Sequence, residues 1–118
     1  MNSIPEKYRN DVSIIRDTAK QISSDFNIDG FEISFSRNDY KAFEEFKIQI
    51  TPLITKIFQK DKIAFQSLLY RIDINEKEYK KALTKIDTKE FETDLAELII
   101  RREFQKVITR RFFSETNK

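Results

Sequence analysis

The sequence predicts a mainly α-helical fold, a bundle of four or five helices with one short extended segment near residues 31–36. In four segments, apolar residues recur at spacings of three and four, the period of an amphipathic helix, and each segment begins with a helix-start signal. The 118-residue chain contains no long linker, low-complexity tract or repeat. We therefore expect one helical domain over residues 1–118, a length typical of a single core.

The first helix is predicted over about residues 4–26. Ser3 and Glu6 have the spacing of a capping box, and Pro5 occupies the first turn, where no amide donor is missed. The apolar stripe that follows consists of Tyr8, Val12, Ile15, Ala19, Ile22 and Phe26. Gly30, the only glycine, is the candidate for a left-handed conformation after this helix.

Residues 31–50 are compatible with two structures. Residues 31–36 alternate apolar and polar side chains, as in a short strand or an extended strap over the core. A second alternating run at 46–50 would complete a β-hairpin at 31–50 and give an α+β fold. We prefer a helix over about 39–58, with Pro52 inside it at a cost of about 3 kcal/mol or with a kink. More apolar residues support the helix, since its expected face includes Phe43, Phe46, Ile50, Leu53, Ile54, Ile57 and Phe58.

Further helical segments follow a polar break at 59–62. Residues 64–72 continue the preceding apolar face, as in a bent helix. Asn75 and Glu78 have the spacing of a capping box before a short helix, and Asp87 and Glu90 repeat that spacing before a long helix over about 89–113. The side chains predicted to be buried are Phe43, Phe46, Leu53, Leu68, Leu95 and Leu98.

The apolar face of the last helix shifts partway along its length. Its first half places Phe91, Leu95, Leu98 and Ile99 on one side, and its second half places Ile100, Phe104, Val107, Ile108 and Phe112 on the other. We interpret Phe104, Ile108 and Phe112, flanked by Arg101 and Arg111, as a candidate interface for self-association. The alternative is that the amino-terminal helix covers these residues within one chain.

The last helix also carries a basic stripe at spacings of four. Its members, Arg102, Lys106 and Arg110, are candidate phosphate-binding residues, and they suggest weak nucleic-acid binding as an alternative function. The structural alternative is that cations near a helix C-terminus are favoured by the helix dipole. The whole chain has a net charge of only +2, so nucleic acid is not the expected partner.

Composition excludes several chemistries. The chain has no cysteine and no histidine, which removes the usual zinc and haem ligands, disulfides, cysteine nucleophiles and serine–histidine–aspartate triads. A single glycine leaves no phosphate-binding glycine loop. The trio Tyr70, Arg71 and Asp73 is the most suggestive acid–base group, although a local structural contact explains it more simply. We therefore predict no enzyme, no catalytic residue, no cofactor and no metal site.

Location and partners are predicted from the same observations. Met1 to Asn10 are polar and charged, no apolar signal region follows, and no segment has the length of a membrane span. We expect a cytoplasmic protein without membrane contact. The predicted function is a non-enzymatic one based on protein–protein contacts, with a second copy or another protein as partner.

The carboxy-terminal half of the chain carries one resemblance. The run from Leu68 to Asp73, together with the run from Leu95 to Glu103 and the pair Gln105–Lys106, resembles small uncharacterised bacterial proteins of unknown function. The resemblance covers roughly the last half of the chain. It implies a cytoplasmic bacterial protein with a helical carboxy-terminal half, and it implies no activity or ligand.

Overall fold

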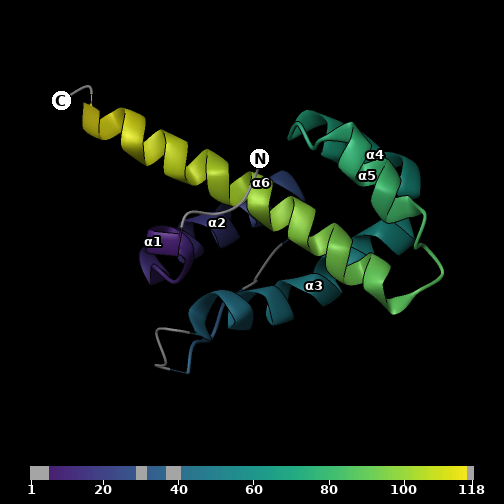
Figure 1. The fold of residues 1–118 in the computed structure, drawn as a ribbon, viewed down its shortest axis with the longest axis horizontal. Helices are drawn as coiled ribbons and strands as arrows, with labels where there is room; N and C mark the ends of the chain where they lie inside the picture. Colours follow the sequence, from purple (N-terminus) through teal and green to yellow (C-terminus); the bar gives the residue numbers. More distant parts are fainter. Residues whose placement is uncertain (1–5, 29–31, 37–40, 117–118) are drawn as a thin grey trace.

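The structure, a computed structural model, describes residues 6–28, 32–36 and 41–116 (Figure 1). Within these residues the chain forms the helices α1 (Glu6–Arg9), α2 (Val12–Asp25), α3 (Ala42–Lys60), α4 (Lys62–Arg71), α5 (Glu76–Leu83) and α6 (Lys89–Thr116). The mainly α-helical prediction is confirmed. The alternative hairpin at 31–50 is wrong, because residues 42–50 belong to α3. The predicted capping residue Ser3 lies outside the described residues.

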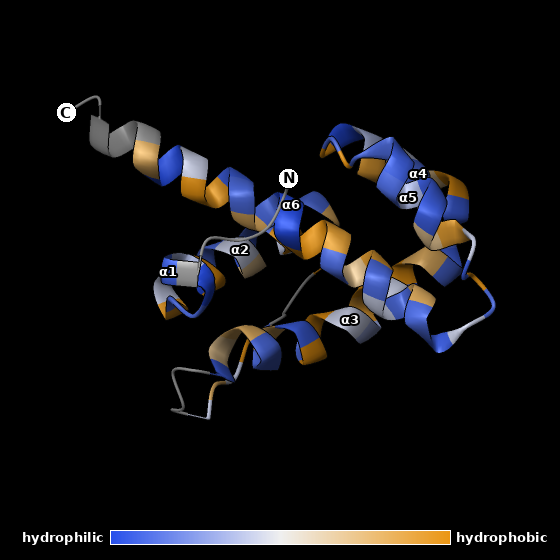
Figure 2. Cartoon of the chain, viewed as in Figure 1, coloured by the Kyte–Doolittle hydropathy of each residue, from blue (hydrophilic) through white to orange (hydrophobic). Residues whose placement is uncertain are grey.

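The longest helix, α6, organises the fold. It contacts α2, α3 and α5 (Figure 1). Phe91 of α6 packs against Phe58 of α3, with ring centroids 5.2 Å apart, and Phe104 packs against Phe43 at 6.1 Å. The two helices therefore run antiparallel. Hydrophobic segments recur along α6 (Figure 2). Its first half contacts α3 and α5, and its second half also contacts α2.

The amino-terminal segment forms two helices where one was predicted. Asp11 lies between α1 and α2, and its side chain caps α2 by accepting from the Ile14 amide at 3.2 Å. Its neighbour Asn10 accepts from the Phe43 amide at 3.0 Å, in the first turn of α3. These side chains satisfy helix-terminal amides, and this favours a break over a continuous helix. The predicted helix over 4–26 is thus corrected to α1 and α2.

Two helices end in a left-handed residue that is not glycine. Asn27 (φ 54°) follows α2, and Asp73 (φ 64°) follows α4. In each case the next amide, that of Ile28 or Ile74, donates to the carbonyl five residues earlier, as in a Schellman motif. Asparagine and aspartate tolerate this conformation better than other non-glycine residues. Gly30, the residue predicted for this role, lies outside the described residues.

Residues 32–36 form an extended strap rather than a strand. Ile33 is buried, and Phe35 packs against the core from the same side. The side chain of Gln49 in α3 donates to the Ser34 carbonyl at 2.8 Å and accepts from the Ser34 amide at 2.9 Å. One side chain therefore supplies the hydrogen bonds that a neighbouring strand would supply. This explains how an alternating sequence is held without a sheet.

The remaining helix boundaries follow local caps. Asp61 separates α3 from α4 and accepts from the Ala64 amide at 3.0 Å, within the predicted polar break. Asn75 caps α5 by accepting from the Glu78 amide at 3.0 Å, which confirms that prediction. The second capping box differs, because Glu90 pairs with Lys85 at 3.4 Å instead of reaching back to the start of α6.

The core agrees with most of the predicted burial. Phe43, Phe46, Leu95 and Leu98 are buried. Leu53 and Leu68 are half-buried and pack at its edge. Helix α3 continues through Pro52, whose side chain is exposed. None of the helices in the described ranges is long and apolar enough to cross a membrane.

Candidate functional site

The predicted self-association patch on α6 belongs largely to the core. Phe104 has no exposed surface, and Ile108 is half-buried against the core. Helix α2 packs on this half of α6. The patch is therefore not an exposed interface centred on Phe104, which packs on Phe43 of α3. The alternative partner, the amino-terminal segment, contacts the same half of α6 through α2, at Lys106, Arg110 and Arg111. Phe112, 59% exposed, lies beyond this covered region.

The two arginines predicted to flank that patch hold neighbouring helices instead. Arg101 pairs with Glu78 of α5, with the Nη2 to Oε2 distance at 2.9 Å. Arg111 donates to the carboxylate of Asp17 and to the hydroxyl of Ser13, both in α2. Each arginine thus connects α6 to a different helix, and each guanidinium has an acidic partner inside the chain.

The predicted phosphate-binding stripe is also engaged within the chain. Arg102 donates from Nε to the Ile72 carbonyl at 3.0 Å and lies 3.7 Å from the carboxylate of Asp73. Arg110 donates to the side chain of Gln21 at 3.0 Å. A phosphate would have to displace or share these contacts. Arg102 and Arg110 are therefore not free to bind a phosphate without losing partners in their own chain.

The third member of the stripe, Lys106, belongs to a buried polar cluster between α2 and α6. Its Nζ lies 3.1 Å from Glu103 and 3.7 Å from Asp25. Glu103 has no exposed surface. Gln21 donates to the other oxygen of Asp25 at 3.0 Å. Asp25 Oδ2 and Glu103 Oε2 are both buried, and neither accepts a hydrogen bond from a described donor.

A proton on Glu103 explains this cluster. Burial, together with the carboxyl group of Asp25, raises the pKa of Glu103 to about 8, against the opposing effect of Lys106. An ionised Glu103 in contact with the Asp25 carboxyl group, away from water, would have a large cost, so Glu103 carries a proton and donates to Asp25. Glu103 does not stand out in the sequence as a candidate site residue. Its position among Ile99, Ile100 and Phe104 on a buried helical face was the available signal.

The clearest exposed feature with apolar character lies on α4 and α5. A cavity of about 640 Å³ is open between these helices. Its apolar and aromatic lining consists of Leu69, Tyr70, Ile74, Tyr79 and Leu83, and its polar lining consists of Gln66, Asp73, Asn75, Glu76 and Lys80. Burial raises the pKa of Tyr79 above its ordinary value, so this phenol stays neutral at physiological pH.

The outer side of α4 extends this apolar surface. Tyr70, at the rim of the cavity, is 88% exposed, and Ile63 is 81% exposed. They are seven residues apart, so they lie on the same side of the helix two turns from each other. The opposite side of α4 places Phe65 and Leu69 in the core. We call Ile63, Tyr70 and the cavity lining the α4–α5 face.

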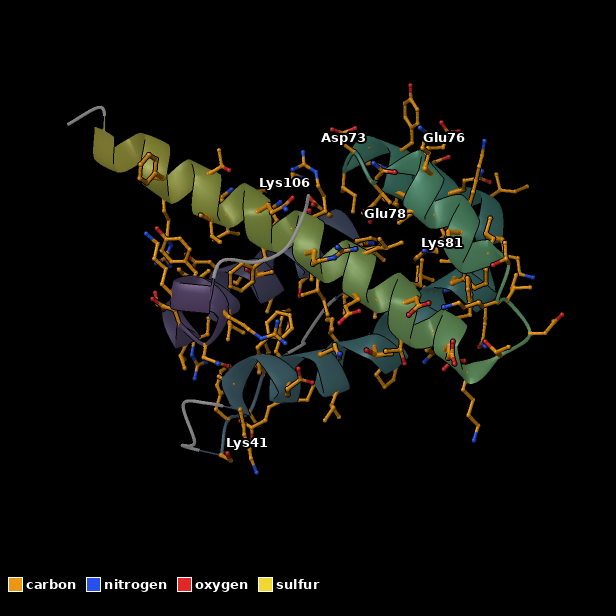
Figure 3. The ribbon with its side chains drawn as sticks, viewed as in Figure 1. Lys41, Asp73, Glu76, Glu78, Lys81 and Lys106 are labelled. Atoms are coloured by element: carbon orange, nitrogen blue, oxygen red, sulfur yellow. The ribbon has the colours of Figure 1, made fainter. Side chains whose placement is uncertain are left out.

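Two smaller hollows lie between α5 and α6. They have volumes of about 300 and 280 Å³, and both are lined by Glu78, Leu98 and Arg101. Figure 3 shows Glu78 and Lys81 between α5 and α6, and Asp73 at the outer end of the α4–α5 pair. Glu78 and Arg101 pair with each other across these hollows and so connect α5 to α6.

The described part of the chain has no group of three acidic side chains placed to share a metal ion. Tyr70 and Asp73, from the suggested acid–base trio, are both exposed. Comparison with protein-family models, with curated proteins and with solved structures finds no match to this chain.

Proposed function

We propose that this protein is a non-enzymatic helical domain that acts through protein–protein contacts made by the α4–α5 face. The observation that carries the proposal is the pair Ile63 and Tyr70, exposed by 81% and 88% beside an open, mostly apolar cavity. A large apolar side chain in water gains free energy when a partner covers it. Contiguous exposed apolar surface commonly marks an interaction site.

The chemistry of the face favours a protein over a small polar ligand. Tyrosine is enriched at the centres of protein interfaces, because it buries a large apolar area and keeps a polar tip. Here Tyr70 stands at the rim, and Tyr79 lies half-buried in the cavity. Charged side chains, including Glu76 and Lys80, surround this centre as a polar rim. A partner with two or three protruding apolar side chains fits this arrangement.

Both walls of the cavity are fixed to the long helix α6. The end of α4 is held by the bond from Arg102 to the Ile72 carbonyl, 3.0 Å. The start of α5 is held by the ion pair between Arg101 and Glu78, 2.9 Å. A surface held in place before binding loses less conformational entropy when the partner binds.

Two observations support a binding role over an enzymatic one. The chain contains no histidine or cysteine, the commonest general base and the strongest thiol nucleophile. The carboxyl group with the most perturbed pKa, that of Glu103, has no exposed surface, so it is closed to a substrate. The intramolecular contacts of Arg102 and Arg110 likewise favour protein contact over phosphate binding.

Site-specific photo-crosslinking tests this proposal. A photoreactive phenylalanine analogue is placed at position 70 in cells that produce the protein, with position 48 as control, because Ile48 is 70% exposed on a different helix. We expect a discrete adduct from position 70 and none from position 48. The protein identified in the adduct is then purified, and Tyr70→Lys should weaken its binding at least tenfold while Ile48→Lys leaves it unchanged. Equal adducts from both positions, or none from position 70, would contradict the proposal.

A further inference from the structure

The outer side of α4 carries one exposed apolar residue near each end, an arrangement that allows two copies of the helix to pack on each other. Ile63 and Tyr70 lie near the two ends of the helix, about 10 Å apart at 1.5 Å per residue. If two copies of α4 pack antiparallel about a two-fold axis, Ile63 of each copy lies level with Tyr70 of the other. Each contact is then made twice, as an isologous interface requires. An aromatic ring against a β-branched side chain is a favourable packing pair.

The centre of this helix face allows close approach. Ser67 lies between Ile63 and Tyr70 and is exposed. It is small, and its hydroxyl donates to the Ile63 carbonyl at 3.3 Å. The hydroxyl thus keeps a hydrogen-bond partner when the face is covered, and burial costs less than for an unpaired polar group. Helix backbones can approach one another where the side chain at the crossing point is small.

Charge at the two ends of α4 selects the antiparallel direction. Lys62 begins the helix and is exposed, and Asp73, two residues beyond its end at Arg71, has a side chain that is 88% exposed. They stand at opposite ends of α4, so each end of the helix carries one exposed charge of its own sign. An antiparallel pair brings Lys62 of each copy toward Asp73 of the other. A parallel pair would instead bring like charges together.

We infer that the partner of the α4–α5 face is a second copy of this chain, bound through antiparallel packing of α4 on α4. The inference rests on the proposed function and names its partner. Two copies each of Ile63 and Tyr70 bury on the order of 600–800 Å², which is below the area of a stable dimer. We therefore expect a reversible dimer with a Kd on the order of 100 μM.

Sedimentation equilibrium of the purified protein tests this dimer directly. Between about 10 μM and 1 mM, the mass should rise from that of one 14.2 kDa chain toward twice that value. Tyr70→Lys should weaken the dimer at least tenfold, and Ile48→Lys, the control on α3, should leave it unchanged. A wild-type protein that stays monomeric at 1 mM overturns the inference.

A charge exchange tests the antiparallel direction. Lys62→Asp and Asp73→Lys each place like charges at both ends of the dimer, so each variant alone should dimerise more weakly than wild type. A mixture of the two restores both unlike pairs and should form a mixed dimer tighter than either variant alone. The control mixture combines Asp73→Lys with Lys41→Asp, a change at the far end of the molecule from α4 (Figure 3). This mixture should not form a mixed dimer tighter than both of its components. If the mixture of Lys62→Asp and Asp73→Lys dimerises no more tightly than either variant alone, the antiparallel arrangement is overturned.

An introduced thiol gives a readout that does not depend on charge. The natural chain has no cysteine, so Ser67→Cys carries a single thiol, placed close to the expected two-fold axis. We expect a disulfide-linked dimer under mild oxidation from Ser67→Cys and not from Lys41→Cys. A photo-adduct with a different protein at position 70, together with monomeric wild-type protein, contradicts the second copy as partner but not the α4–α5 face. Absence of any adduct at position 70 contradicts both.

Discussion

The buried carboxyl group of Glu103 in the middle of α6 meets the half-buried carboxyl group of Asp25 at the end of α2, beside the ammonium group of Lys106. Lys106 Nζ lies 3.1 Å from Glu103 and 3.7 Å from Asp25. Helices α2 and α6 form an extensive contact, and this pair lies within it. The free energy of that contact therefore depends on the protonation state of Glu103.

Stability is predicted to fall as the pH rises toward 8. The folded protein raises the pKa of Glu103 from 4.5 to about 8, so between these values the folded state binds a proton that the unfolded state has released. The contribution of Glu103 is complete below pH 4.5 and is lost as the pH rises through about 8. Urea unfolding of wild type at pH 5 and pH 9 should reveal this loss, on the order of a few kcal/mol.

Glu103→Gln isolates this residue from the other titrating groups. Its amide N–H can donate to Asp25 as the protonated carboxyl group does, without titrating. We expect wild type and Glu103→Gln to have similar free energies of unfolding at pH 5, and Glu103→Gln to be the more stable at pH 9. The matched control is Glu92→Gln, an exposed position on the same helix. A difference between wild type and Glu103→Gln that does not change with pH would show that Glu103 is not protonated in the folded state.

Phe104→Ala is predicted to destabilise the monomer. Phe104 has no exposed surface and packs edge-on against Phe43. Truncating a buried phenylalanine costs about 3–5 kcal/mol, through lost burial and the cavity left behind. Phe112→Ala, at a position 59% exposed, should cost clearly less. Chemical unfolding measures both, and equal losses would argue against the burial of Phe104 within one chain.

Asn75→Ala is predicted to weaken the start of α5 and one wall of the cavity. The Asn75 side chain accepts from the Glu78 amide at 3.0 Å, and loss of such a cap costs about 1 kcal/mol. Hydrogen exchange should show faster exchange of the Glu78 amide. Lys77→Ala, an exposed change in the same turn, should leave that amide protected. Unchanged exchange in Asn75→Ala would mean that the cap does not hold α5.

Gln49→Ala is predicted to release the strap at 32–36. Gln49 satisfies both the amide and the carbonyl of Ser34, at 2.9 and 2.8 Å. Without it, the Ser34 amide loses its hydrogen-bond acceptor and should exchange much faster. Gln59→Ala, at an exposed position of the same helix, serves as the control. Protection of Ser34 in Gln49→Ala would indicate that burial of Ile33 alone holds the strap.

Features with local causes were predictable from the sequence. The Asn75 cap and the polar break at Asp61 depend on hydrogen bonds between residues three apart, so neighbouring side chains specify them. The helix through Pro52 was predictable because its apolar face outweighs one missing hydrogen bond. The break at Asn10 was missed because Asn10 bonds to Phe43, which is distant in the sequence. No pattern within 4–26 specifies that partner.

The candidate site was predictable only in part. Tyr70 and Asp73 drew attention as an acid–base trio with Arg71, whereas the structure places Tyr70 at the rim of an apolar cavity. Neither Ile63 nor Tyr79 stood out, because an apolar residue on a helix has the same pattern whether a neighbour covers it or not. The basic stripe was correctly placed on one helix. Its partners, such as Gln21 for Arg110, come from a helix far away in the sequence.

Most helix positions follow from local sequence, because helix period and caps act over three or four residues. Which helix faces are covered depends instead on how the helices pack together. Phe104 is buried against Phe43 of α3 and Phe112 is exposed, although both belong to the same predicted apolar face of the last helix. Tertiary packing also placed Glu103 beside Asp25 and thereby raised its pKa. Burial and pKa depend on which helices pack together, and that choice follows from the total free energy of the folded chain rather than from any local pattern.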